Sequence, residues 1–222
     1  MDRRKTSFLI NFSKVKREKQ KIYIQDAEDL YEWLFQYLET EMNLREIVRA
    51  KSMFRELCGF PKDKKLTKEE ELHFEHWLLF DYITVIGSRP FDLFVRSRQS
   101  EMSKYMVETA GLFMLMHLSP YRVLQSNDRE HLLAPFQEER ENAVRSLGPA
   151  QRLESGSLIM ARIATVGFEK MMVGPCITIS SQREQEALEE LRTHEKMGTK
   201  SYHRFLKEMG ISFLKYRAEN ET

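Results

Sequence analysis

The chain has 222 residues, of which 41% are hydrophobic and 11% aromatic, and its formal net charge is +1. A chain of this size buries about 70% of its unfolded surface, so disorder throughout is excluded. No apolar run reaches the roughly 18 to 20 residues that a bilayer-spanning helix needs, and residues 1–10 lack the apolar core of a signal peptide. Two cysteines are too few for a disulfide framework or a structural zinc site, which predicts a reduced, cytoplasmic protein.

Positive charge is concentrated at the N-terminus. Residues 1–24 carry eight Lys or Arg side chains against Asp2 and Glu18, a local charge of +6 that leaves −5 for the rest of the chain. Such asymmetry is typical of an arm with its own partner, although basic termini are often only solvated. The candidate partner-binding residues of this basic arm are Arg3, Arg4, Lys5, Lys14, Lys16, Arg17, Lys19 and Lys21.

The arm also contains apolar residues, and these predict that one segment of it docks, with the protein's own core as the expected site. The residues concerned are Phe8, Leu9, Ile10, Phe12 and Val15. Nucleic acid is one candidate partner, because the cations could neutralise phosphates while Phe8, Phe12 and Tyr23 stack on bases. A helix that lies on the acidic remainder of the chain is the alternative.

From residue 26 to about residue 122 the apolar spacing is helical. Asp26 is a candidate N-cap, and Thr67 with Glu70 forms a capping box for a later helix. Pro90 suits the first turn of a short helix, and Gln99 or Ser100 is the expected start of a longer one. Helices are predicted over 29–40, 43–57, 67–80, 91–98 and 99–116.

After Pro120 the period changes to that of strands. Short runs separated by glycines predict strands over 121–126, 131–137, 142–147, 157–166, 168–173 and 176–179. Gly167 lies between two of these runs, where a hairpin turn is expected. A charged helical pattern returns over 185–194 and 199–216.

These patterns predict an α+β protein with an N-terminal helical region, a small antiparallel β-barrel or sheet of SH3 or OB size, and C-terminal helices. The expected divisions are a basic arm over 1–24, a helical domain over 25–119, a small β domain over 120–180 and a helical tail over 181–222.

One histidine cluster could bind a metal ion. Glu70, His73 and His76 follow one another at helical spacing, so two imidazoles and a carboxylate could share a face. The spacing differs from the zinc-protease pattern, in which the histidines are four residues apart. Phe74 and Trp77 define the buried face, which places His73 beside that face and His76 further out. A polar helix flank without metal is the favoured interpretation, and a metal-dependent enzyme is the alternative.

No pattern nominates a catalytic nucleophile or a cofactor. Cys58 is predicted at the C-terminus of a helix, where the dipole raises the pKa of a thiol, and Cys176 is predicted inside an apolar strand. The sequence lacks a G-x-S-x-G elbow, a Walker A loop and a G-x-G-x-x-G run. A non-enzymatic binding or adaptor protein, which contacts nucleic acid or a protein partner through its basic arm, is therefore favoured over an enzyme.

Residues 74–82 read Phe-Glu-His-Trp-Leu-Leu-Phe-Asp-Tyr and are followed by Gly87, Arg89-Pro90 and Phe94. This stretch resembles the F-x-x-W-x-[LF]-F-D-Y segment of uncharacterised bacterial proteins that carry a SEC-C motif. Residues 119–124 look like the S-x-[YF]-x-V-L strand of the same proteins. Residues 153–179 are similar to their later strands, with Ala161-Arg162 and Gly174-Pro175 at the matching positions.

The resemblance covers about residues 66–180 and implies a helical part followed by a small β-barrel. The SEC-C motif itself binds zinc through a cysteine cluster, which this chain lacks, so no zinc role is carried over. The matched motif residues are expected to be structural: Trp77, Phe80, Asp81, Tyr82 and Arg162. Asp81 is expected to accept N–H groups of the 84–91 loop or to pair with Arg89 or Arg162, and a site acid is the alternative.

Overall fold

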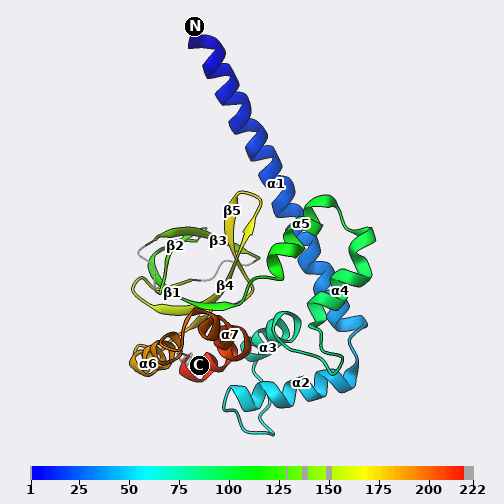
Figure 1. Ribbon diagram of the computed structural model, residues 1–222, viewed down its shortest axis with the longest axis vertical. Helices are drawn as coiled ribbons and strands as arrows, with labels where there is room; N and C mark the ends of the chain where they lie inside the picture. Colours follow the sequence, from blue (N-terminus) through cyan, green and yellow to red (C-terminus); the bar gives the residue numbers. More distant parts are fainter. Residues whose placement is uncertain (1, 129, 137–139, 149–151, 218–222) are drawn as a thin grey trace.

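The computed structural model describes residues 2–128, 130–136, 140–148 and 152–217, with side chains from residue 12 onward. Helices come first, a small barrel follows, and further helices complete the chain (Figure 1), which confirms the predicted α+β class. The first helices are α1 (Asp2–Thr40), α2 (Leu44–Leu57), α3 (Lys68–Phe80), α4 (Pro90–Arg98), the 3-10 turn η1 (Gln99–Glu101) and α5 (Lys104–Phe113). The strands are β1 (Leu118–Ser126), β2 (Glu130–Pro135), β3 (Asn142–Leu147), β4 (Leu158–Val166), β5 (Glu169–Val173) and β6 (Ile177–Thr178). The last elements are α6 (Glu184–Glu195), α7 (Thr199–Met209) and η2 (Gly210–Tyr216).

Local side-chain caps explain where several helices begin. Thr67 and Glu70 form the predicted capping box at the start of α3, and Pro90 occupies the first turn of α4. The α5 helix starts later than expected because the hydroxyl of Ser103 caps it, accepting from the Met106 N–H at 3.1 Å. Residues 99–101 form a separate 3-10 turn.

Helix α1 is a continuous helix of 39 residues, with no break at residue 24 where the arm was expected to end. Its first half projects away from the body, and its second half lies alongside α4 and α5 (Figure 1). Asp26 therefore lies inside a helix and does not cap one; its carboxylate contacts the Ser103 hydroxyl. Leu30 and Leu34 are fully buried on the side that faces the body.

The barrel closes through the strand order β1-β2-β3-β5-β4, because β1 also pairs with β4, and β6 extends β4. All pairs are antiparallel except β3 with β5. Strand β1 reaches both neighbours by pairing with β4 through Leu118–Arg122 and with β2 through Tyr121–Ser126, with a bulge between Val123 and Gln125. This is the strand order of the five-stranded Greek-key barrel known as the OB-fold.

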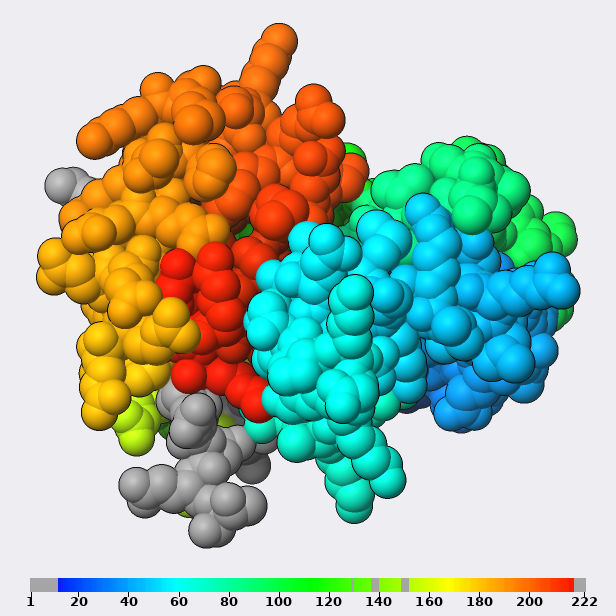
Figure 2. Space-filling model, turned by 90° about the horizontal axis from the view of Figure 1, so that it is seen from below, coloured from blue at the N-terminus to red at the C-terminus, as the bar shows by residue number. Residues whose placement is uncertain are grey.

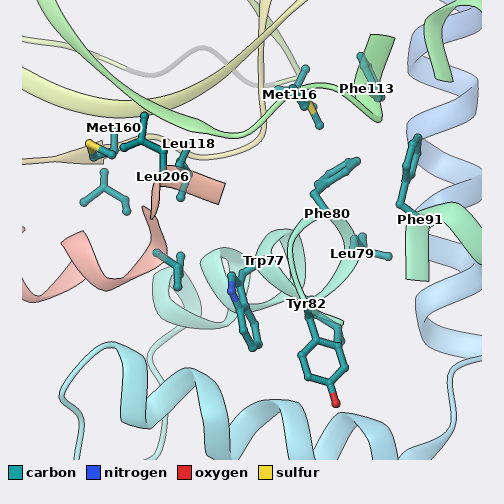
Figure 3. Close-up of a cluster of buried hydrophobic side chains, with 14 of the residues drawn as sticks. Trp77, Leu79, Phe80, Tyr82, Phe91, Phe113, Met116, Leu118, Met160 and Leu206 are labelled. Carbon is teal, nitrogen blue, oxygen red and sulfur yellow. The ribbon is translucent and has the colours of Figure 1, made fainter. Parts of the chain in front are cut away.

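Two hydrophobic clusters hold the fold together. The smaller one fills the barrel and includes Val123, Leu133, Val144, Ile159 and Met172. The larger one joins the outer side of β4 to the helices, and each fully buried large side chain in it contributes about 1.5–3 kcal/mol. Figure 3 shows ten of its members: Trp77, Leu79, Phe80, Tyr82, Phe91, Phe113, Met116, Leu118, Met160 and Leu206.

The C-terminal helices cover one end of the barrel and reach the helical region. Segment η2 packs beside α2, as the space-filling view shows (Figure 2). The α-helix predicted over 199–216 ends at Met209, and the chain continues as the 3-10 turn η2. Gly210 stands at the change, where an added Cβ would lie 3.0 Å from the Leu118 Cβ of β1, so the close approach of η2 to the barrel favours glycine there.

Candidate nucleic-acid interface

The basic arm is the projecting half of α1, and its described cations all face solvent. Lys14, Arg17 and Lys21 are spaced three and four residues apart, so they lie on one side of the helix. Lys16 lies on the side of the barrel, and Lys19 is exposed as well. The side chains of Arg3, Arg4 and Lys5 are outside the described part of the chain.

The expectation that the apolar residues of the arm dock on the protein's own core is wrong for the two whose side chains are described. Phe12 is 62% exposed and Val15 is 53% exposed, because α1 has left the body at this level. Gln20 is the first buried residue along the described part of the helix. The side chains of Phe8, Leu9 and Ile10 lie outside the described residues.

Gln20 fixes α1 to the hairpin that joins β4 to β5. Its Nε2 donates to the Val166 carbonyl at 3.0 Å, and its Oε1 accepts from the Phe168 N–H at 2.7 Å. Between them, Gly167 has a φ of +62°, and an added Cβ would lie 2.6 Å from the Gln20 Oε1. The predicted hairpin at Gly167 is confirmed, and the glycine lets the turn approach α1 closely.

The turn presents an aromatic ring beside the arm. Phe168 is 49% exposed, and the Lys16 Nζ lies 5.2 Å from the centre of its ring. Tyr23 meets the same ring edge-on at 6.1 Å and donates its hydroxyl to Glu108 at 2.5 Å. The hydrogen bond to Glu108 raises the pKa of Tyr23 to about 12, so the phenol stays neutral. Tyr23 therefore supports Phe168 from behind, and Phe168 is the exposed ring.

A groove of about 640 Å³ begins at this ring and continues over β3 and β5. Its charged lining consists of Arg140, Arg145 and Lys170 together with Glu130, Glu141 and Glu169; Asn142, Ala143 and Phe168 complete the described walls. Arg145 pairs with Glu169 at 3.0 Å, and the Lys170 Nζ donates to the Asn142 Oδ1 at 2.5 Å. These bonds orient cationic groups along the groove.

The arm and the groove form one surface with Phe168 at the junction. Residues 12–24 and the groove together hold eight Lys or Arg and four Glu, a local net charge of +4. A cationic surface with an exposed aromatic ring can neutralise phosphates and stack on a base. The basic arm was predicted from the sequence, but the interface residues Arg140, Arg145, Phe168 and Lys170 were not. One local signal for Phe168 was present, since an aromatic residue directly follows the predicted turn glycine.

The prediction that His76 lies further from the buried face of α3 than His73 is wrong. His73 and His76 are both 1% exposed, because α3 is surrounded by α1, α2 and the barrel. Burial lowers the pKa of each imidazole to about 3, so both are neutral at pH 7. His76 bonds through Nδ1 to the Leu72 carbonyl at 2.7 Å and through Nε2 to the Tyr31 hydroxyl.

The Glu70 carboxylate has its own partners, which do not include the two histidines. Its carboxylate accepts from the Thr67 N–H at 2.9 Å and pairs with Lys64 at 2.7 Å and Arg217 at 2.6 Å. Among the residues that the structure describes, no group of three or more His, Cys, Asp or Glu side chains could hold a metal ion. The structure therefore does not bring Glu70, His73 and His76 together as a ligand set.

Asp81 and Arg162 form a buried pair between the end of α3 and the outer side of β4. The Arg162 side chain is 0% exposed, that of Asp81 is 5% exposed, and the Arg162 Nη2 donates to the Asp81 Oδ2. Arg89, the other expected partner, pairs with Asp92 at 2.8 Å. Trp77, Phe80 and Tyr82 are also buried, with the Tyr82 hydroxyl bonded to Glu46 and Arg49 of α2.

Both cysteines are buried, and they are not joined in a disulfide. Burial raises the pKa of both Cys58 and Cys176 to about 12, which leaves them protonated and weakly nucleophilic at pH 7.

Comparisons of this chain with models of protein families, with curated proteins and with solved structures gave no match. Within the described part of the chain, every helix is too short or too polar to span a lipid bilayer.

Proposed function

We propose that this chain is a non-enzymatic, cytoplasmic protein that binds single-stranded nucleic acid across the arm and the groove. The observation that carries the proposal is the junction at Phe168, where the Lys16 ammonium of the basic arm, an exposed ring and a groove of mixed charge meet. Phosphates would contact the cations of α1 and the groove, and a base would stack on Phe168. The two buried, protonated thiols suit a reducing compartment.

Three features support nucleic acid over other partners. OB-fold barrels bind oligonucleotides or oligosaccharides on the face of their second and third strands and at the turn between the fourth and fifth, which includes β3 and Phe168 here. Eight cations favour a phosphate backbone over a neutral sugar chain. The exposed ring favours unpaired bases over a duplex, whose bases are already stacked.

The proposal is tested by the fluorescence anisotropy of labelled single-stranded DNA and RNA. We expect Phe168→Ala to weaken binding by about 1–3 kcal/mol, the usual contribution of one stacked base. The triple variant Lys14→Glu, Arg17→Glu, Lys21→Glu is expected to abolish binding at moderate salt.

A matched variant reverses three exposed lysines in and directly after the connection between α2 and α3, at the end of the molecule away from the arm (Figure 1): Lys62, Lys65 and Lys68. This control should bind like the wild type, since it has the same net charge as the arm variant but an intact arm. Equal losses in both triple variants would indicate general attraction only. If an acidic peptide bound and no nucleic acid did, the partner would be a protein and the proposal would fail.

A further inference from the structure

A second cavity, of about 460 Å³, lies between α1, α3 and the connection that follows β5. Its described walls combine apolar and aromatic side chains with two carboxylates: Tyr31, Phe35, Glu69, Leu72, His73, Glu75, His76, Leu147, Gly174, Pro175 and Cys176. Concave, mostly apolar cavities with few polar groups are the usual sites of small ligands.

One wall is a fixed aromatic surface. The Tyr31 and Phe35 rings are 4.8 Å apart, and the Phe35 and His76 rings are 5.0 Å apart. Because the Leu72 carbonyl accepts from the Nδ1 of His76, the Nε2 is left to accept from the Tyr31 hydroxyl. Gly174 lies directly against His76, where an added Cβ would be 2.1 Å from the Cδ2 of the ring. The three rings are therefore held in place from both sides.

The charge on the lining has a single sign. Of the described residues that line the cavity, Glu69 and Glu75 carry charge, and none is Lys or Arg. Partial burial raises the pKa of the Glu75 carboxyl, the nearby Glu71 and Glu39 raise it further, and Lys51, which does not line the cavity, lowers it by a smaller amount. A bound cation would lower the electrostatic cost of ionising Glu75. Aromatic faces also attract cations.

We propose that this cavity binds a small organic cation, an amine with an aromatic body that packs on Tyr31 and Phe35 while its ammonium group pairs with Glu75. The site is independent of the nucleic-acid interface, since it has the opposite charge and shares no residue with it. The ring system would replace water along the apolar wall, and the ammonium group would offset the charge of Glu75.

Isothermal titration of the full chain with three matched probes tests the proposal: tryptamine, the neutral tryptophol and the anionic 3-indolepropionate. We expect tryptamine to bind at least about tenfold more tightly than tryptophol, and 3-indolepropionate to bind most weakly. Glu75→Gln should weaken tryptamine about tenfold and leave tryptophol unchanged.

Leu72→Trp fills the mouth of the cavity and should weaken both tryptamine and tryptophol. Leu72 is 42% exposed, so this change spares the core. Leu44, at the start of α2, is 72% exposed, and Leu44→Trp is the matched control that should bind normally. Thermal melting of each variant verifies that it is folded. The proposal is overturned if tryptophol or 3-indolepropionate binds as tightly as tryptamine, if Glu75→Gln leaves tryptamine binding unchanged, or if no probe binds below about 1 mM.

Discussion

Charged side chains are buried on one side of the barrel and exposed to solvent on the other. On β4, Arg162 has a fully buried side chain that pairs with Asp81 beneath the helices. On β3, Arg145 has a side chain that is 45% exposed and pairs with Glu169 in the open groove. Helices α1 and α5 contact β4, whereas the start of β5 and part of β3 line the open groove beside the arm.

This difference indicates that the buried charges of the barrel serve stability and the exposed charges serve binding. A charge under the helices is costly to leave unpaired, so it must serve the fold. A charge in the groove stays hydrated and contributes little to stability, so it remains available to a ligand. The following changes test that separation, beginning with the largest expected effect.

Removing the buried carboxylate should be the most damaging change. Asp81→Ala leaves the Arg162 guanidinium buried without its counter-ion and is expected to lower the free energy of unfolding by about 3–5 kcal/mol. Urea unfolding followed by circular dichroism measures it. Glu169→Ala, which breaks the exposed pair with Arg145, is the matched control and should cost about 0–1 kcal/mol. Similar losses in both variants would contradict the separation.

Gly167→Ala should cost about 2–4 kcal/mol, because it adds a clash with Gln20 to the strain of a positive φ. Gly156→Ala separates the two contributions. Gly156 has a φ of +89° but no atom within 4 Å of an added Cβ, so its replacement should cost only about 1–2 kcal/mol. Equal losses at the two sites would show that the hairpin does not approach α1 as closely as described.

The buried histidines predict a loss of stability in acid. His73 and His76 have pKa values of about 3 in the folded state against an ordinary 6.5, so the unfolded state binds more protons below pH 6.5. Their contribution to stability is complete above pH 6.5 and is lost as the pH falls toward 3. Between pH 6.5 and 5 the free energy of unfolding should fall by about 1–3 kcal/mol, and His73→Gln should reduce that fall. A flat profile in urea unfolding would refute this.

Gln20→Ala should cost about 1–2 kcal/mol, because it leaves the Phe168 N–H and the Val166 carbonyl without their shared partner. It should also weaken nucleic-acid binding by loosening α1 from the groove. Gln25→Ala removes an exposed amide from the same helix and should change stability by less than about 0.5 kcal/mol. A harmless Gln20→Ala would mean that the hairpin does not depend on this amide.

Local signals in the sequence predicted much of the fold. The capping box of Thr67 and Glu70 and the turn at Gly167 depend on neighbouring residues, and both are present. The resemblance to SEC-C-associated proteins stays a prediction, although Asp81 and Arg162, which belong to its motifs, do lie in contact.

The remaining features depend on distant parts of the chain. Gln20 meets residues 146 and 148 positions away, which no local pattern encodes. His76 was misplaced because α3 is buried on nearly every side, so helical periodicity could not separate an inner face from an outer one. The groove could not be predicted from local patterns, because β3 and β5 become neighbours only when the barrel closes.

The dependence of nucleic-acid affinity on salt tests the proposed interface most directly. Anisotropy of labelled oligo(dT) between about 50 and 200 mM salt gives the slope of log K against log salt, which reports the number of phosphates that the protein neutralises. Replacing Lys14, Arg17 and Lys21 by Gln should reduce the steepness of that slope by about 2, and the same replacement at Lys62, Lys65 and Lys68 should leave it unchanged. An unchanged slope in the arm variant, or no binding by the wild type at about 50 mM salt, would contradict the proposed interface.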